Sequence, residues 1–173
     1  LGGTRHDKGL DILLKALKDV KAPFQLVIAG KPEDFDEDYI VSHTEKYRDK
    51  VRLCLRFLSD EEVKEFLVES DIIVLPYRRE FDGASGPMCE GIYLGKTIIG
   101  PSHGSLGSQL QSSHAGYTFE SENVEQLAAC IEYALTHPCV YDETAYQMQK
   151  ELSPELFAER YLRIYREVVQ KKG

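Results

Sequence analysis

The sequence lacks the patterns that mark metal sites and disulfide-rich scaffolds. Its four cysteines, at positions 54, 89, 130 and 139, form no C-x-x-C pair, and three of them lie in or beside apolar stretches. Cysteines in such surroundings behave as small buried hydrophobic residues, so we expect reduced thiols. The five histidines show no H-x-x-x-H spacing, and we therefore expect neither a metal site nor a metal requirement.

Long apolar runs and clusters of positive charge are also missing. No apolar run approaches the ~20 residues of a membrane-spanning helix, and no charged-then-apolar leader opens the chain. We therefore expect no transmembrane segment, no signal peptide and a cytoplasmic location. The formal net charge of -8 argues against nucleic-acid binding and against a patch for anionic membranes, because both usually need clustered lysine and arginine. An anionic ligand would have to be bound by a local group of residues.

The bulk composition is that of an ordinary globular chain. With 173 residues, of which 42% are hydrophobic and 29% charged, the chain is long enough for one domain with its own core. We expect one domain over residues 1–173. The opening Leu1-Gly2-Gly3 looks like the end of a strand already under way, which favours a fragment of a longer protein.

Short β-branched runs alternate with amphipathic segments along the chain. The runs predict strands at residues 25–29, 51–55, 72–75 and 97–99, and each run is continuously or almost continuously apolar. Such strands suit a parallel sheet that helices cover on both faces. The predicted fold class is therefore α/β, with a Rossmann-like parallel sheet.

Apolar periodicity predicts the helices between and after these strands. Leucines at positions 10, 13, 14 and 17 have the spacing of one buried helix face, and Ser59 with Glu62 forms a capping box for a later helix. Two further stripes predict helices nearer the end of the chain, the second of them after Ser153-Pro154: Val124, Leu127, Ile131 and Leu135, and then Phe157, Tyr161, Ile164, Tyr165 and Val168.

The most informative segment is Asp82-Gly83-Ala84-Ser85-Gly86-Pro87-Met88-Cys89-Glu90, in which two carboxylates bracket a turn of small residues. Small residues let backbone N–H groups approach a ligand, and a helix that begins at Gly86 or Pro87 would direct its positive end at an anion. Ionised carboxylates accept hydrogen bonds from sugar hydroxyls, whereas loop amides suit phosphate. The pattern suggests a sugar-nucleotide site, although a loop aspartate and a solvated helix glutamate would give the same sequence.

Two other places could bind an anion. Gly2-Gly3-Thr4-Arg5-His6-Asp7-Lys8-Gly9 puts two cations before an amphipathic helix, and Arg5 and Lys8 could bind a diphosphate and stabilise its departure without a metal. Gly30-Lys31 directly follows a predicted strand, at the carboxyl edge where open α/β sheets bind ligands. Solvated strand-to-helix turns have the same composition, so neither motif decides the matter alone.

A second turn of small residues follows later in the chain. His103-Gly104-Ser105-Leu106-Gly107 precedes a helix that we expect near Leu110, and this turn could close over a bound sugar or phosphate. Glu80 and the pair Arg78-Arg79 receive no role in this interpretation, because they could equally face solvent.

Taken in order, these segments resemble the carboxyl-terminal, donor-binding domain of the retaining GT-B glycosyltransferases of the glycosyl transferases group 1 family. The resemblance covers essentially the whole chain. Its motifs are Arg5-x-x-Lys8-Gly9-Leu10, Leu26 to Gly30, Ser70 to Pro76, the E-x7-E-like segment with Pro87 inside it, and Gly95-Lys96-Thr97 leading to Gly104. It implies the carboxyl-terminal half of a GT-B fold.

The resemblance implies a role for each candidate residue. Glu90 would bind the nucleotide ribose, and Asp82 would lie against the donor sugar, where the family usually has a glutamate that is one methylene longer. The family's usual Gly-Phe-Gly is Gly83-Ala84-Ser85 in this chain. The basic pair would bind the diphosphate, and the remaining candidates would complete the donor site: Arg5 and Lys8, then Ser85, Gly86, Gly30 and Lys31.

The resemblance also implies an activity. A hexosyl group would pass from a nucleotide-diphosphate sugar, such as a UDP- or GDP-sugar, to an acceptor with retention of anomeric configuration, with no cofactor and no divalent metal. The acceptor, a carbohydrate or a lipid-linked molecule, would bind an amino-terminal domain that this chain does not contain, so we expect the piece alone to be inactive. Glycan or polysaccharide biosynthesis would be the pathway class.

The resemblance also leads to expectations about the last helix and about the location of the protein. The last helix of such enzymes often crosses back to the amino-terminal domain, which predicts a partly exposed apolar face from Phe157 to Val168. The full-length protein would be cytoplasmic, or peripheral to the inner face of the membrane.

Two alternatives stay open. The chain could belong to a GT-B nucleotide-sugar epimerase, whose chemistry acts on the sugar ring instead of transferring the sugar. It could also be a non-catalytic, nucleotide-sugar-binding partner subunit, and aspartate in place of glutamate at position 82 is the feature that suggests this.

Overall fold

The strands of the molecule are short and parallel. The computed structural model describes residues 1–81 and 83–170. Asp82, which the sequence interpretation places against a donor sugar, lies outside the described residues. The strands within them are β1 (Leu26–Ala29), β2 (Val51–Cys54), β3 (Ile72–Val74), β4 (Thr97–Pro101) and β5 (Gly116–Phe119).

The strands pair in two groups. β1 pairs with β2, and β4 lies between β3 and β5, with every pair parallel. The predicted parallel α/β arrangement is confirmed, with its pairing divided between two sheets. β5 does not follow from the sequence pattern, because its Gly-Tyr-Thr-Phe sequence is not a continuous apolar run.

Helices and 3-10 turns connect the strands. The predicted capping box is present, since Ser59 Oγ accepts from the N–H of Glu62 and the N–H of Ser59 donates to Glu62 Oε2. The helix expected near Leu110 begins earlier than predicted, so Gly104 and Ser105 form its first turn. The elements are η1 (His6–Lys8), α1 (Leu10–Ala16), α2 (Glu37–His43), η2 (Glu45–Lys50), α3 (Asp60–Glu69), α4 (Gly86–Tyr93), α5 (Gly104–Ser113), α6 (Val124–Thr136), α7 (Glu143–Glu151) and α8 (Pro154–Gln170).

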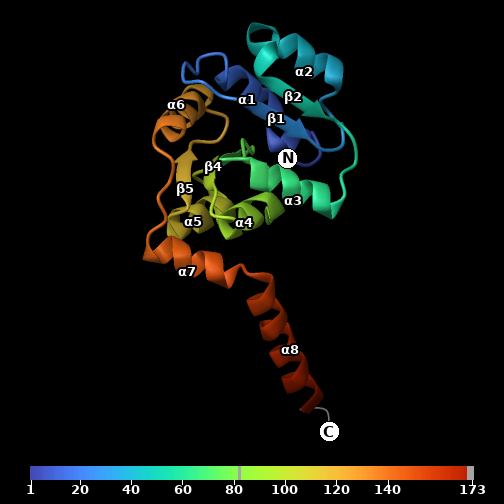
Figure 1. The fold of residues 1–173 in the computed structure, drawn as a ribbon, viewed down its shortest axis with the longest axis vertical. Helices are drawn as coiled ribbons and strands as arrows, with labels where there is room; N and C mark the ends of the chain where they lie inside the picture. The colour runs from blue at the N-terminus through green and yellow to red at the C-terminus, as the bar shows by residue number, and fades with distance from the viewer. Residues whose placement is uncertain (82, 171–173) are drawn as a thin grey trace.

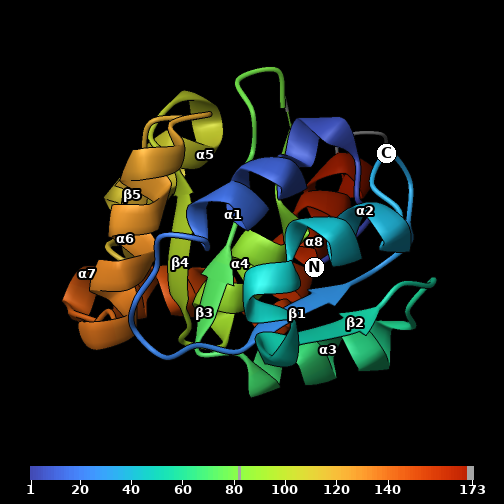
Figure 2. The same cartoon turned by 90° about the horizontal axis from the view of Figure 1, so that it is seen from above.

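Two apolar cores lie on opposite faces of the strands. Neighbouring strand residues point to opposite faces, so Ile99 joins the core beneath α1 and α6, whereas Ile98 joins the core beneath α4 and α5. The first core also contains Ile28 of β1 and Phe119 of β5, and it therefore joins the two sheets. Figure 2 shows α2 and α3 on opposite sides of β1 and β2. The continuously apolar strand sequences follow from this double burial.

The final helix stands apart from both cores. Figure 1 shows α8 extending away from the other elements, beyond α7. Its apolar side chains are exposed, as the sequence predicted, and every one of the following is at least 47% exposed: Phe157, Tyr161, Leu162, Ile164, Tyr165, Val168 and Val169. In the described part of the chain, α8 included, no helix combines the length and the apolar character needed to cross a membrane.

One close backbone contact brings the start of the chain onto the end of β3. Gly9 has φ +65°, and a Cβ atom at this position would overlap the carbonyl oxygen of Pro76. Glycine is therefore required both by the left-handed backbone and by the approach of the two chains. This contact places residues 5–8 beside the segment that leads from β3 to α4.

We predict that Gly9→Ala destabilises the protein by at least about 2 kcal/mol, because the new methyl group adds overlap with Pro76 to the cost of a left-handed alanine. Gly104→Ala is the matched control. Gly104 has φ +66° but open space around the position of a Cβ atom, so it should lose only the conformational part, about 1 kcal/mol. Urea denaturation measures both, and equal losses would contradict the packing role of Gly9.

We also predict that ending the chain at Ser153 leaves the free energy of unfolding within about 1 kcal/mol of the full value, because exposed residues contribute little to stability. The truncated chain should also bind less to a hydrophobic column, since the exposed apolar face of α8 is gone. Thermal denaturation provides the first measurement. A large fall in the unfolding midpoint would show that α8 packs on the rest of the chain.

Candidate functional site

The first residues of the chain run beside the carboxyl end of β1. The N–H of Gly2 donates to the carbonyl of Ala29 at 2.8 Å, and the N–H of Thr4 donates to the carbonyl of Lys31 at 3.0 Å. A Cβ atom on Gly30 would overlap the carbonyl oxygen of Gly2, so this glycine permits the close approach. Gly30 thus has a packing role, and ligand binding by Gly30 and by the exposed Lys31 stays a prediction.

Residues 5–8, which we call the cation loop, follow directly. Arg5 donates from Nε to Asp7 Oδ1 at 3.0 Å and from Nη2 to Asp7 Oδ2 at 2.6 Å. The hydrogen bond from Arg5 lowers the pKa of Asp7 below the usual aspartate value. The sequence interpretation assigned Arg5 to a diphosphate but did not include this bidentate pair. A bound diphosphate would compete with Asp7 for the guanidinium.

Lys8 is in a different environment from Arg5. Burial, and then the nearby positive charge of Arg5, lower the pKa of Lys8 below the usual lysine value. Its Nζ lies close to the backbone of Gly2, 2.9 Å from the position that a Cβ atom would take there. An anion that approached this ammonium would stabilise its charged form, which burial disfavours.

Helix α4, which follows β3, begins with a turn that the Ser85 side chain caps. Ser85 is buried, its Oγ accepts from the N–H of Met88 at 3.3 Å, and the hydroxyl of Tyr77 lies 3.3 Å from the same atom. Pro87 occupies the first turn, where a missing N–H costs nothing. The Ser85 hydroxyl is therefore used within the protein, and a ligand here would meet the backbone of Ser85 and Gly86.

Glu90 lies one turn inside α4, as the sequence predicted. The residue is exposed, and its Oε1 lies 3.6 Å from the position of a Cβ atom on Gly86, along the first turn of the helix. Partial burial, and then the charge of Asp60, raise the pKa of Glu90 above the usual glutamate value. This carboxylate is accessible to a ligand that rests on the start of the helix.

Tyr77 connects the cation loop to α4. Its ring is buried against Phe81, with the centroids 4.3 Å apart, and its hydroxyl reaches Ser85. Burial raises the pKa of Tyr77, and the hydrogen bond with Ser85 opposes this rise. The next residue, Arg78, donates its N–H to the carbonyl of Asp7 at 2.9 Å, so the cation loop lies beside this segment. The structure therefore brings Arg5 and the start of α4 to the same region.

The start of α5 joins this edge through a short relay. Ser121 Oγ donates to the carbonyl of Tyr77 at 2.8 Å, and Nδ1 of His103 lies 3.0 Å from Ser121 Oγ. His103 is the residue just before α5, so the predicted second turn of small residues lies near Tyr77. Whether this turn closes over a ligand stays a prediction.

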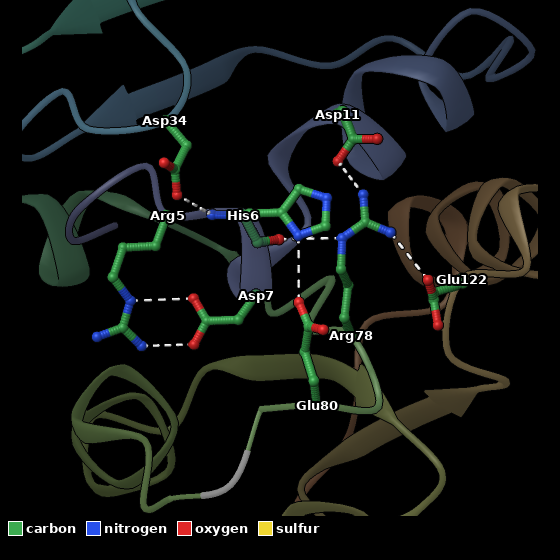
Figure 3. Close-up of polar contacts among 8 residues, drawn as sticks. All are labelled: Arg5, His6, Asp7, Asp11, Asp34, Arg78, Glu80 and Glu122. Carbon is green, nitrogen blue, oxygen red and sulfur yellow. Dashed lines mark hydrogen bonds and ion pairs between the residues drawn. The ribbon is translucent and has the colours of Figure 1, made fainter.

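Arg78 is the residue of this edge that the sequence interpretation missed. Figure 3 shows its guanidinium between the carboxylates of Asp11 and Glu122, beside the backbone of His6. Its side chain is 13% exposed, whereas that of Arg79 is 64% exposed. The position of Arg78, two residues after Pro76, was a usable signal, but its partners lie 67 and 44 positions away in the sequence.

A shallow hollow beside β2 is too acidic to bind an anionic ligand. It has a volume of about 350 Å³ and lies between β2 and α3, where it is lined by Arg52, Phe66 and the carboxylates of Glu62, Glu65 and Glu69. Three carboxylates and one arginine give it an excess of negative charge. The hollow therefore does not compete with the edge described above as a place for an anionic ligand.

The fold and sequence of the chain are similar to those of known glycosyltransferases. An uncharacterized glycosyltransferase of Methanocaldococcus jannaschii is 31% identical over 127 residues, which are 73% of this chain and 34% of that protein. Sucrose-phosphate synthase from Thermosynechococcus elongatus matches with a TM-score of 0.75 and 16% identity, over 98% of this chain and 45% of that one.

Two further solved structures have the same fold. A glycosyltransferase from Rickettsia africae matches with a TM-score of 0.73 and 21% identity, over 97% of this chain and 47% of that one. HepE from Anabaena, in complex with UDP, matches with a TM-score of 0.70 and 16% identity, over 94% of this chain and 48% of that one. The chain thus spans about a third of its curated relative and about half of these structures.

The family comparison agrees with the geometry and with the fold. The model of the glycosyl transferases group 1 family matches residues 1–152, which include every element from η1 to α7. The family match over most of the sequence and the parallel α/β fold lead to one conclusion, which is that this chain belongs to the glycosyl transferases group 1 family, with the α/β architecture of GT-B glycosyltransferases.

Proposed function

We propose that this chain is the donor-binding half of an enzyme that transfers a sugar from a nucleotide-diphosphate sugar to an acceptor, with retention of anomeric configuration. The observation that carries the proposal is the approach of the cation loop to the start of α4, through the Gly9–Pro76 contact and through Tyr77. A cationic loop and a helix amino terminus at the carboxyl ends of parallel strands are complementary to a diphosphate.

The two cations would have different tasks in the proposed site. Lys8 is half-buried and would gain from a nearby phosphate, because an anion offsets the burial that lowers its pKa. Arg5 would exchange Asp7 for phosphate oxygens, which match its forked donors in the same way. Each donor that acts on the departing nucleoside diphosphate would contribute about 2–4 kcal/mol to the reaction, if it acts like a single oxyanion donor.

The carboxylates would hold the two ends of the donor. Glu90 would accept hydrogen bonds from the ribose hydroxyls, since it is exposed beside the first turn of α4. Asp82 would lie against the donor sugar. The acceptor hydroxyl would attack the anomeric carbon as the nucleoside diphosphate departs on the same face, with no metal taking part.

The rest of the reaction would need residues outside this chain. We propose that an amino-terminal domain binds a carbohydrate or lipid-linked acceptor, and that this domain covers the exposed face of α8. The transferred group would be a hexose, in glycan or polysaccharide biosynthesis. UDP is the first nucleotide to test, because HepE, which shares this fold, was solved in complex with UDP.

Calorimetry and thermal denaturation with UDP, GDP, ADP and their sugars test the proposal. A ligand at 100 times its dissociation constant adds about 2.7 kcal/mol to the stability of the protein, so binding raises the unfolding midpoint measurably. Failure of every nucleotide in this panel to bind the folded chain would contradict the proposed donor site.

We predict that Lys8→Ala weakens nucleoside diphosphate binding at least tenfold, because a hydrogen bond to a charged group contributes about 1.5–3 kcal/mol. Lys64→Ala is the matched control. Lys64 is an exposed lysine of α3, on the opposite side of the molecule from α1, and its removal should leave the dissociation constant unchanged. Titration calorimetry on both variants gives the comparison, and equal affinities would remove Lys8 from the site.

We predict that Glu90→Gln weakens binding of the nucleoside diphosphate about three- to tenfold, or about 0.7–1.4 kcal/mol, because the amide accepts ribose hydrogen bonds less strongly than a carboxylate. The exposed Glu65 of α3 provides the control substitution, Glu65→Gln. The loss should vanish for inorganic pyrophosphate, which has no ribose. A loss of the same size for pyrophosphate would argue against ribose binding by Glu90.

Product analysis on the full-length protein decides the reaction type. A new glycosidic bond with retained configuration supports transfer, whereas an epimerised nucleotide sugar supports the epimerase alternative. Tight donor binding by this chain counts against a partner subunit whose nucleotide site has decayed.

A further inference from the structure

We propose that Arg78 is the positioning residue of the donor site, which holds the cation loop in register with the segment that leads to α4. The inference rests on the proposed function, because it concerns how the diphosphate-binding groups are kept in place. Arg78 would not touch the ligand itself, since its guanidinium is bonded to three groups of the protein and its side chain is 13% exposed, whereas that of Arg5 is 49% exposed.

The donors of Arg78 reach three different segments. Nη2 donates to Asp11 Oδ1 in α1 at 2.7 Å, Nη1 donates to Glu122 Oε1 after β5 at 2.9 Å, and Nε donates to the carbonyl of His6 at 3.0 Å. A planar fork with five N–H donors can make these contacts together, whereas a lysine ammonium cannot reproduce the geometry.

A backbone contact completes the connection to the cation loop. The N–H of Arg78 donates to the carbonyl of Asp7 at 2.9 Å, next to the side-chain contact with His6. His6 and Asp7 are the two residues between Arg5 and Lys8. Arg78 therefore fixes the middle of the cation loop from both its backbone and its side chain.

Arg78 belongs to the segment that leads to α4, so its contacts with His6 and Asp7 connect that segment to the cation loop. Arg78 lies between β3 and α4, in the segment that reaches Ser85 seven residues later. One residue thus joins the cationic part of the proposed diphosphate site to the part formed by the helix amino terminus. Movement of the loop by even about 1 Å would misplace the cations, and errors of this size are costly in catalysis.

The charges around Arg78 keep it in place. Asp11 is buried, and burial opposes its ionisation, but the hydrogen bond from Lys15 and the charge of Arg78 outweigh it and lower the pKa of Asp11. Glu122 supplies a second carboxylate from the other side. A guanidinium that two carboxylates neutralise is a structural anchor and not a free phosphate ligand.

A second set of contacts ties the same loop from its outer side. His6 Nδ1 lies 3.1 Å from Glu80 Oε1, and the N–H of His6 donates to Asp34 Oδ2 at 2.7 Å. Both side chains of the His6–Glu80 contact are exposed, whereas the Arg78–Asp11 pair is largely shielded, with side chains 13% and 10% exposed. Solvent weakens the shielded Arg78–Asp11 pair less than the exposed His6–Glu80 pair, so we assign the main positioning role to Arg78.

The test compares UDP with uridine, because a positioning role for the cation loop concerns phosphate and not the base or ribose. In Arg78→Met, the dissociation constant for UDP should rise at least tenfold, while that for uridine, measured by NMR titration, should stay within twofold. Arg79→Met is the matched control, since Arg79 is the exposed neighbour, and its UDP affinity should stay within twofold.

Glu122→Gln guards against a variant that fails to fold. It removes one ionic partner of Arg78 at an exposed position, and it should weaken UDP binding two- to fivefold with uridine binding unchanged. If Arg78→Met does not fold, this substitution decides the question, and an unchanged UDP affinity in Glu122→Gln then overturns the proposal.

The remaining outcomes separate the inference from the proposed function. Suppose that the native chain binds UDP and that Arg78→Met and Glu122→Gln bind UDP and uridine equally well. This result overturns the positioning role of Arg78 and leaves the donor site intact. Equal losses for UDP and uridine in Arg78→Met would also overturn it, since they indicate a general structural defect. A native chain that binds no nucleoside diphosphate removes the donor site and this inference together.

Discussion

The backbone approach of Gly9 to Pro76 is the constraint on which the candidate site depends. It brings a loop that starts beside β1 against the end of β3, although the two strands belong to different sheets. Arg78 then fixes the same loop through polar contacts. Tyr77, which lies between Pro76 and Arg78, contacts Ser85 at the start of α4 through its hydroxyl. The Gly9–Pro76 packing contact determines where the loop lies, and the hydrogen bonds from Arg78 fix the backbone of His6 and Asp7 within it.

Electrostatic balance explains how an acidic chain can present an anion site. The chain carries a net charge of -8, yet Arg5, Lys8 and Arg78 gather where the start of the chain meets the segment after β3. Arg5 and Arg78 are paired with carboxylates, whereas Lys8 is half-buried and burial lowers its pKa. The local arrangement matters here, and the total charge does not.

The sequence predicted the elements whose pattern is local and missed those that depend on distant partners. Four apolar runs predicted β1 to β4 correctly, and the capping box at Ser59 predicted the start of α3. β5 escaped prediction because its burial comes from α5 and α6, not from an apolar run of its own. Arg78 was missed for a similar reason, since its partners Asp11 and Glu122 meet it only in the folded chain.

The projecting helix has a mechanical consequence. α8 is a 17-residue rod of about 25 Å, and it meets the rest of the chain through α7. α7 in turn packs on α4 and α5, where Gln149 donates to the carbonyl of Tyr93 at 2.7 Å. A protein domain that binds α8 would therefore transmit force through α7 to α4 and α5. The amino-terminal ends of these two helices face the candidate site.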